Sequence, residues 1–355
     1  MRRWIGRTAG ALCGLMAVCT GLPLVESDEW WIRIFDFPRL QIAGVMAIAL
    51  VVFVLTRPSA RGWLLVLPLS FLALACQVWM IAPYTPAWQV EMLAVERCGE
   101  ESRVRFLMAN VLQENRNAQS LLRLVNETDP DIILLTEVDD WWAQEMQTLV
   151  ETHPNTVREP LSNTYGIALY SRLPLADSEV RHILDDDIPS ILTQVRLPDG
   201  GTFSLWAVHP TPPRPGGDTD ERDAELLLVA KEVAAQEAPA IVAGDLNDVA
   251  WSTTTTLFQE ISGTLDPRIG RGLYATFNAD WPLLKWPLDH LFASEQWTLG
   301  EFRRLADIGS DHFPILVELC HQPQAAIVQQ PDKPETGDRE EADGHIKEGR
   351  DAAAE

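Results

Sequence analysis

Basic residues are scarce in this chain. Its 355 residues include 28 Lys and Arg against 51 Asp and Glu, which gives a formal net charge of −23 at pH 7. General nucleic-acid binders obtain most of their affinity from basic contacts to phosphate, so a stable nucleic-acid complex is not expected. A phosphodiester substrate would still be compatible with this composition if positive charge were local or carried by a metal ion.

Two sequence signatures of enzyme chemistry are also missing. The chain has no G-x-S-x-G motif and no glycine-rich phosphate loop that ends in lysine. In addition, no side chain stands out as a nucleophile. Hydrolytic chemistry in this chain is therefore expected to use an activated water molecule and no covalent intermediate.

Cysteine is rare outside the apolar runs of the chain. Of five cysteines, Cys13, Cys19 and Cys76 lie in apolar runs, whereas Cys98 and Cys320 bracket the remainder. If that remainder faces an oxidising compartment, a disulfide between Cys98 and Cys320 is a reasonable hypothesis. The alternative is two unrelated free thiols.

Three long apolar runs occupy the first part of the chain, at residues 8–25, 40–55 and 62–83. Each has about the length that spans a bilayer, the second being the shortest. Trp30, Trp31, Trp63 and Tyr84 stand at their ends, as is typical of the membrane interface. Residues 1–86 are therefore predicted to form three transmembrane helices with the lipid bilayer as partner. A signal peptide, or an apolar hairpin in a soluble fold, is the less favoured interpretation.

The loops between these runs predict an orientation. Basic residues precede the first run, and the loop after the second run carries Arg57 and Arg61 without any acid. The positive-inside rule places both segments in the cytoplasm of a cell whose plasma (inner) membrane holds the protein. After three crossings, everything beyond Pro83 is predicted to lie outside the cytoplasm, in the periplasm or extracellular space.

The remainder of the chain is predicted to be an α/β domain. Residues 87–102 form a connector, 103–320 the domain, and 321–355 a disordered acidic tail without an apolar period. Strands alternate with helices at first and then pair locally. This order favours a two-sheet β-sandwich flanked by helices, in four layers, over a single wound sheet.

The segment 240–247, A-I-V-A-G-D-L-N, shows most clearly how polar side chains follow a strand. A short apolar run is typical of a buried strand, and Gly244 would let the backbone turn where that strand ends. Asp245 and Asn247 are two residues apart, so extended geometry would point them the same way. The alternative is an ordinary strand end with turn-forming residues.

Similar polar side chains follow, or in one case precede, other apolar strands. They are Asn110, Glu137, His209, Asp245 and Asn247, with Asp311 and His312 just before the last strand. Carboxylates, amides and histidines without cysteine suit Mg²⁺ or Mn²⁺ better than zinc. Ligand groups tend to gather beyond strand ends, so these residues are expected to share one site.

These residues stand in motifs that resemble those of the endonuclease/exonuclease/phosphatase superfamily of DNase-like phosphoesterases. The motifs are M-A-N at Asn110, L-L-T-E at Glu137, W-A-V-H at His209, A-G-D-L-N at Asp245 and Asn247, L-D-H-L-F at Asp289, and G-S-D-H-F-P-I at Asp311 and His312. They follow the order of the family across residues 103–319. The membrane-anchored bacterial type of the family is the most similar.

The resemblance implies a role for each residue. Glu137 would be the principal metal ligand, with Asn110 placing metal or phosphate and Asp311 binding metal or water. His209 and Asn247 would hold the phosphate, and Asp245 would orient or deprotonate the attacking water. His312 would be the other acid, base or charge stabiliser, and Asp289 would fix its tautomer.

The chain departs from the family at one position. Some members carry an acid two residues after the first Asn, where this chain has Leu112, so a second metal site is in doubt. Arg116, Arg158, Arg172 and Arg214 are candidates for local positive charge, although ordinary solvated arginines are the preferred interpretation for most. His290 would face away from Asp289 and serve the core or the surface.

The sequence thus predicts a membrane-anchored Mg²⁺-dependent phosphodiesterase or phosphomonoesterase. Its substrate would be extracellular nucleic acid or, with slight preference, a phospholipid or sugar-phosphate headgroup. The alternatives are a catalytically silent binding or sensing domain on a membrane anchor and a metal-dependent hydrolase of other esters.

Overall fold

The computed structural model describes the chain except for residues 26, 58, 214 and 355 and the side chains of residues 60 and 61. The chain divides into two compact units. Met1–Trp88 with Pro213–Thr219 form the first, which we call the helical unit. Gln89–Pro212 with Asp220–Glu355 form the second, the sandwich unit.

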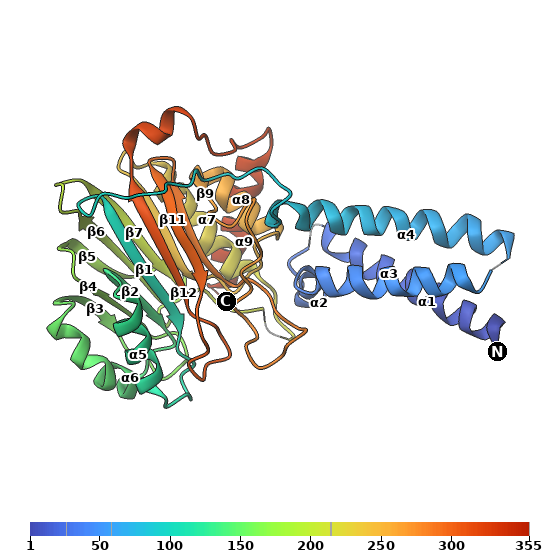
Figure 1. Ribbon diagram of the computed structural model, residues 1–355, viewed down its shortest axis with the longest axis horizontal. Helices are drawn as coiled ribbons and strands as arrows, with labels where there is room; N and C mark the ends of the chain where they lie inside the picture. The colour runs from blue at the N-terminus through green and yellow to red at the C-terminus, as the bar shows by residue number, and fades with distance from the viewer. Residues whose placement is uncertain (26, 58, 214, 355) are drawn as a thin grey trace. The chain divides into compact units, whose positions relative to one another are not determined.

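Three long helices dominate the helical unit. Helix α1 (Arg2–Gly21) packs against α3 (Arg39–Leu55) and α4 (Ala60–Ile81), as Figure 1 shows. Short helical segments join or extend them: η1 (Leu22–Leu24), α2 (Trp30–Arg33), η2 (Ile34–Asp36) and η3 (Ala82–Tyr84). Apolar side chains face outward along α3 and α4, including Ile48, Leu64 and Leu72 at 68, 73 and 71% exposure.

The described part of the helical unit contains two helices that are long and apolar enough to cross a membrane, Arg2–Leu24 and Gly62–Tyr84. The predicted middle span is the weak one. Helix α3 has 17 residues, or about 26 Å at 1.5 Å per residue, against a hydrocarbon core of about 30 Å. It reaches span length only together with Trp30–Asp36, from which it is bent by 74°. The prediction of three spans is therefore supported for two, with the third depending on this bent pair.

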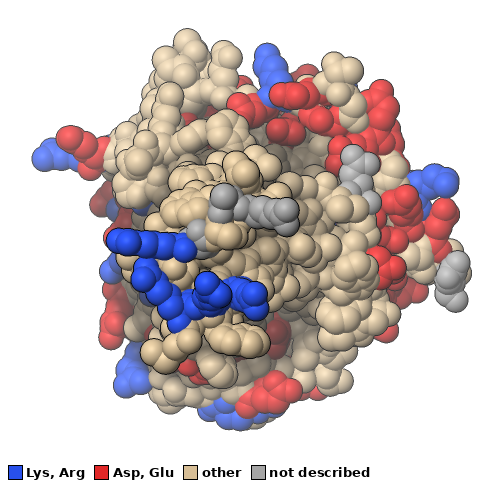
Figure 2. All heavy atoms as spheres, turned by 90° about the vertical axis from the view of Figure 1, so that its right-hand side faces the viewer, with Lys and Arg blue, Asp and Glu red and all other residues tan. Residues whose placement is uncertain are grey.

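The two ends of the three-helix bundle differ in polarity. Arg2 donates to the carbonyl of Leu55 at 3.0 Å, which places the start of α1 beside the end of α3. Exposed arginines gather at this end (Figure 2), namely Arg2, Arg3, Arg7 and Arg57. At the other end, buried Arg39 bonds to Asp36 at 2.6 Å and to Gln77 at 3.4 Å, and Gln77 bonds to Thr20 at 3.0 Å. Such polar contacts hold helices together where the surroundings are apolar.

The sandwich unit contains two six-stranded mixed sheets. The first has the order β11 (Trp297–Arg304), β12 (Ile315–His321), β1 (Arg103–Asn110), β2 (Ile132–Thr136), β4 (Ile167–Ser171) and β3 (Asn155–Glu159). The second has the order β5 (Leu175–His182), β6 (Pro189–Arg196), β7 (Thr202–Val208), β8 (Ala240–Asp245), β10 (Asp289–Ser294) and β9 (Thr264–Leu265). Strands β1 and β2 are parallel, as are β7 and β8, and Asn110, Glu137, His209 and Asp245 lie at or directly after the ends of these four strands.

Helices cover the outer face of each sheet. Helices α5 (Ala118–Thr128) and α6 (Asp140–Glu145), with η4 (Met146–Glu151), share an apolar cluster with the first sheet. Helices α7 (Asp220–Ala234) and α8 (Thr253–Ser262) share another with the second sheet. A third cluster fills the space between the sheets, with Phe106, Leu134, Leu205 and Ile241 fully buried. The predicted two-sheet sandwich flanked by helices is confirmed.

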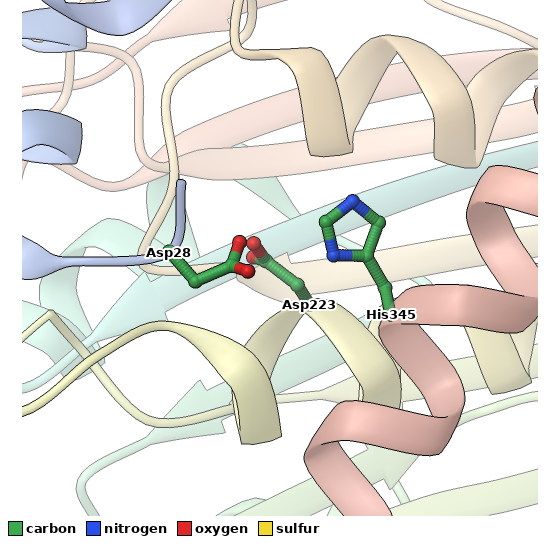
Figure 3. A group of neighbouring side chains, drawn as sticks. All are labelled: Asp28, Asp223 and His345. Carbon is green, nitrogen blue, oxygen red and sulfur yellow. The ribbon is translucent and has the colours of Figure 1, made fainter. Parts of the chain in front are cut away.

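The C-terminal segment differs from the prediction of a disordered tail. It forms η5 (Pro323–Ile327) and α9 (Asp338–Ala352), and α9 packs on α7 (Figure 1). Asp223 of α7 and His345 of α9 lie within 4.8 Å of each other (Figure 3). Only Ala342 and Ile346 enter the apolar cluster, which is too few for a visible period in the sequence. Gly349 allows the close approach, because a Cβ there would lie 2.4 Å from that of Ala224.

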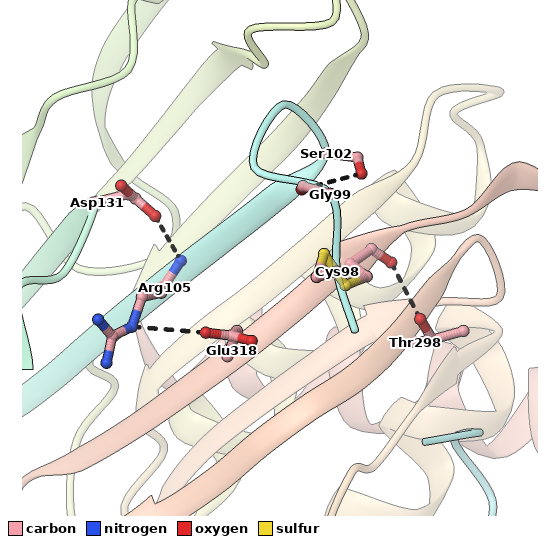
Figure 4. Close-up of a disulfide and its surroundings, with 8 residues drawn as sticks. Cys98, Gly99, Ser102, Arg105, Asp131, Thr298 and Glu318 are labelled. Carbon is pink, nitrogen blue, oxygen red and sulfur yellow. Dashed lines mark hydrogen bonds and ion pairs between the residues drawn. A yellow bond between two sulfur atoms is a disulfide. The ribbon is translucent and has the colours of Figure 1, made fainter. Parts of the chain in front are cut away.

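The segment that follows Trp88 belongs to the sandwich unit. Leu93 and Val95 exchange backbone hydrogen bonds with Leu299 of β11, at 2.8 and 2.9 Å, and Met92 is buried between the sheets. Further along, Cys98 forms a disulfide with Cys320 at the end of β12, with the Cα atoms 5.7 Å apart (Figure 4). The hypothesis of a disulfide between these two cysteines is thus confirmed in the structure. The bond links the N-terminal segment of the sandwich unit to its last strand.

Loss of this disulfide should destabilise the sandwich unit. The bond closes a loop of 222 residues, so its removal gives the unfolded chain more entropy, and we expect a cost of about 3 kcal/mol. In a unit of this size, that cost lowers the melting temperature by roughly 10 °C. Calorimetry of Cys98→Ser/Cys320→Ser measures the effect. Dithiothreitol should lower the wild-type value to that of the variant and leave the variant unchanged; equal shifts in both proteins would contradict the prediction.

Candidate active site

Strand β8 carries the acid at the centre of the site. It continues through Asp245, and Gly244 lies inside the strand at φ 152°. A Cβ on Gly244 would lie 1.9 Å from the carbonyl oxygen of Val208. The expectation that Gly244 forms the turn is therefore wrong: the glycine is needed because β7 and β8 approach closely. This approach brings the ends of both strands to one place.

The carboxylate of Asp245 is the point on which the other side chains converge. Its Oδ2 accepts from Asn110 Nδ2 at 3.0 Å and lies 3.5 Å from His312 Nε2 and 3.9 Å from His209 Nε2. Its Oδ1 accepts from the backbone N–H of Asn247 at 3.0 Å. Asp245 is 1% exposed, so its orientation is fixed by these contacts.

Asn110 is the last residue of β1, and Glu137 directly follows the parallel strand β2, both strands lying in the other sheet. Asn110 Nδ2 donates to Glu137 Oε1 at 2.9 Å, and the backbone of Gln113 donates to Glu137 Oε2 at 3.1 Å. Glu137 has a left-handed backbone, with φ 61°, a conformation that costs a non-glycine residue about 1–2 kcal/mol and clusters at functional sites. Burial, together with the charges of Asp245 and Asp311, raises the pKa of Glu137.

His312 and Asp289 form a buried pair. His312 Nδ1 lies 2.8 Å from Asp289 Oδ2, and the ring packs against Phe277 at a centroid distance of 5.0 Å. Ser310 fixes the loop, because its hydroxyl donates to the carbonyl of Asn110 and accepts from the backbone of His312. Burial alone would lower the pKa of His312, but the carboxylates of Asp289, Asp245 and Asp311 raise it to about 10.

Asp311 and Glu137 provide oxygen donors suited to a cation. Asp311 Oδ1 is buried, and no hydrogen-bond partner reaches it within the described part of the chain. Burial and the charge of Asp245 raise the pKa of Asp311, so its charged form is unfavourable in these surroundings. Such hard oxygen donors suit Mg²⁺ or Mn²⁺. The residues present therefore fit a divalent cation.

A second arrangement of ligand atoms lies beside the first. One atom each of Asp245, Asp289 and His312 lies within 4.8 Å of the others, which is close enough to hold a metal. In this arrangement His312 Nδ1 is already hydrogen-bonded to Asp289.

His209 and Asn247 are fixed at the edge of this cluster. His209 is 3% exposed and packs against Tyr165, and its burial lowers its pKa, which favours the neutral ring. Asn247 has φ 51°, so the extended geometry assumed from the sequence is absent. Its side-chain amide donates to the carbonyl of Pro210 at 2.9 Å and thereby ties the turn after β8 to the loop after β7.

Several further residues lie near the candidate site or were considered for it. His290 is buried, with its ring 2.7 Å from Arg268 and 2.9 Å from the carbonyl of Asp248, so it serves the core as expected. Ser310 and Phe277 were missed, although Ser310 stands inside the quoted G-S-D-H motif. Arg116, Arg158 and Arg172 bond to Asp139, Gln147 and Asp129, and Arg214 lies outside the described residues.

Comparisons with known proteins bear on the family and the fold of the chain. Residues 108–312 match the sequence model of the Endonuclease/Exonuclease/phosphatase family. No curated protein matches the chain. Among solved structures, humanized TDP2 of D. rerio is similar at 17% identity and a TM-score of 0.51, over 61% of this chain and 99% of that one. The human Nocturnin catalytic domain with bound sulfate is similar at 17% identity and a TM-score of 0.50, over 62% of this chain and 94% of that one.

Proposed function

The chain belongs to the endonuclease/exonuclease/phosphatase family, and we propose that it is a membrane-anchored, Mg²⁺-dependent phosphoesterase that acts outside the cytoplasm. The family acts on phosphoester bonds, so a phosphodiester or phosphomonoester is the substrate class. The observation that carries the proposal is the convergence of Asn110, Glu137, His209 and His312 around Asp245, from both sheets of the sandwich.

Glu137, Asn110 and Asp311 would hold the cation, because they supply the hard oxygen donors beside Asp245. A bound Mg²⁺ or Mn²⁺ would neutralise charge on the phosphate and make phosphorus more electrophilic toward water. The orphaned Oδ1 of Asp311 and the raised pKa of Glu137 support this assignment, because a bound cation would offset the cost of burying these carboxylates. Leu112 stands where some members carry a further acid, so one cation is the proposed number.

The remaining residues handle water, protons and phosphate oxygens. Asp245 orients or deprotonates the attacking water, and its own orientation is held by the backbone of Asn247. His209 donates from its neutral ring to a phosphate oxygen, with Asn247 beside it. His312, positioned by Asp289, supplies positive charge or a proton to the leaving group.

The substrate is proposed to be a phospholipid or sugar-phosphate headgroup in preference to nucleic acid. The net charge of −23 opposes general binding of a polyanion. Two helices are apolar enough to hold the chain at a bilayer, and three crossings would put the sandwich unit outside. The exposed arginines at one end of the helical unit favour that end for the cytoplasm (Figure 2). The disulfide is typical of oxidising compartments.

A panel of phosphoesters tests the proposal. The purified full-length chain, with Mg²⁺ or Mn²⁺, should hydrolyse bis-p-nitrophenyl phosphate and lose this activity in EDTA. No turnover of any phosphoester would favour the silent binding domain, and turnover of carboxylic esters alone would favour the other hydrolase. An active alkaline phosphatase fused to the C-terminus is expected in cells, and an inactive fusion would contradict the outside location.

A further inference from the structure

An apolar loop projects from the sandwich unit beside the candidate site. Residues 278–286, N-A-D-W-P-L-L-K-W, lie between β9 and β10, and we call this segment the Trp281 loop. Trp281, Leu283 and Leu284 are 60, 81 and 40% exposed. Large apolar side chains exposed together on a soluble surface usually mark an interaction site.

The base of the loop is joined to the catalytic residues. Phe277, which precedes the loop, forms backbone bridges to both Trp286 and His312. Its ring packs on the ring of His312 at 5.0 Å between centroids, and Ala279 donates to the carbonyl of Asp311 at 2.7 Å. A partner that binds the apolar tip is therefore held next to His312.

Two cations flank this base. Lys285 Nζ and Arg304 Cζ lie 4.3 and 4.4 Å from the ring centroid of Phe313, the residue after His312. Lys285 donates to the carbonyl of Ala279 and Arg304 to that of Ala275, so both heads are held at the base of the loop. Asp280 is the one acid within the loop sequence. The arrangement therefore places apolar side chains at the tip and positive charge behind them.

This order matches the layers of a lipid surface, in which apolar chains lie deepest and anionic phosphates lie above them. Trp is enriched at that boundary, and Leu enters the acyl region. Nucleic-acid bases could also stack on a Trp, but Leu283 and Leu284 offer them no ring, and the overall acidity opposes a polyanion.

We propose that the Trp281 loop inserts into the surface of a phospholipid bilayer and that the site therefore acts on the phosphate ester of a membrane lipid. This inference rests on the proposed phosphoesterase function and narrows its substrate to a phospholipid within a bilayer. Lys285 and Arg304 bind lipid phosphates at the base of the loop, and the inserted tip keeps the headgroup of a neighbouring lipid beside His312.

The variant Trp281→Ser/Leu283→Ser/Leu284→Ser separates lipid from soluble substrates. Full-length protein is assayed on bis-p-nitrophenyl phosphate and on mixed detergent micelles of phosphatidylglycerol, phosphatidylethanolamine or phosphatidic acid. We expect kcat/KM for at least one lipid to fall roughly ten-fold or more, because the apolar contact is lost, while hydrolysis of the soluble diester stays within two-fold. The matched control, Ile327→Ser/Val328→Ser, alters side chains that are 78 and 71% exposed elsewhere in the unit and should leave both activities unchanged.

A second measurement follows insertion without turnover. A fluorescent amino acid is placed at position 283 or, as the exposed reference, at position 327, and the full chain is reconstituted in nanodiscs that contain doxyl-labelled phosphatidylcholine. We expect quenching at position 283 well above that at position 327. Absence of this quenching overturns the inference, as does an equal loss of lipid and soluble activity in the loop variant, or a loss confined to oligonucleotide hydrolysis. If the wild type hydrolyses no phosphoester, the proposed function fails, and the quenching alone decides whether the loop binds the bilayer.

Discussion

Glu137→Gln is expected to reduce Mg²⁺-dependent hydrolysis of bis-p-nitrophenyl phosphate by about 10³-fold. The carboxylate would be the principal ligand of the cation, and the amide that replaces it supplies one neutral oxygen. Asn110 can still donate to that oxygen, so the local fold is retained. The loss of activity should therefore appear in kcat/KM at any Mg²⁺ concentration that saturates the wild type.

The same substitution should separate cation binding from folding. Burial and neighbouring carboxylates raise the pKa of Glu137, so its charge is unfavourable without a cation. We expect Glu137→Gln to melt at the wild-type temperature or above in EDTA. Mg²⁺ should raise the melting temperature of the wild type and not that of the variant, because a ligand stabilises the folded state only if the folded state binds it.

Glu114→Gln is the matched control for Glu137→Gln. Glu114 is exposed, lies near the start of the site in sequence, and stands outside the family pattern. It should keep full activity and the full effect of Mg²⁺ on melting. A Glu137→Gln enzyme that retains more than a tenth of wild-type activity would remove Glu137 from the proposed metal site.

The sandwich was predictable because its central strands are buried on both sides. Segments such as 132–135 and 240–243 are continuous apolar runs, and all their residues are buried. Strand β3 gave no such signal, since each of its five residues is only half-buried at a sheet edge. Helix α9 was missed for a related reason, because its contact with α7 depends on two apolar residues and the small Gly349.

The sequence predicted which side chains lie close together at the candidate site, but not the contacts that join them. Strand ends that carry Asn110, Glu137, His209 and Asp245 could be recognised because apolar runs precede them. Ser310 bonds to the carbonyl of Asn110, and Phe277 packs on His312. Both contacts join residues that are distant in sequence, so no local pattern predicts them. Glu137 and Asn247 have positive φ values, so extended-strand geometry could not predict where Asn247 points.

Asp289→Asn should slow hydrolysis about 10³-fold, although Asp289 is proposed to act only through His312. The carboxylate lies 2.8 Å from His312 Nδ1 and accepts a hydrogen bond from its N–H. This contact orients the ring so that Nε2 faces Asp245. An asparagine can present its amide N–H to Nδ1 instead, which requires a neutral ring protonated on Nε2 and so disfavours the imidazolium. The loss should appear mainly in kcat, because the proposed contacts of His209 and Asn247 with the substrate would be unchanged.

The pH profile distinguishes this role from a merely structural one. Nearby carboxylates, Asp289 foremost among them, raise the pKa of His312 to about 10 despite its burial. Loss of one negative charge makes the protonated ring less favourable, so the limb of the pH–rate profile that reports His312 should move to lower pH in Asp289→Asn. In a His312→Gln background, Asp289→Asn should then have little further effect, because the two residues act as one unit. Additive losses, or an unshifted limb, would show that Asp289 does not act through the imidazole.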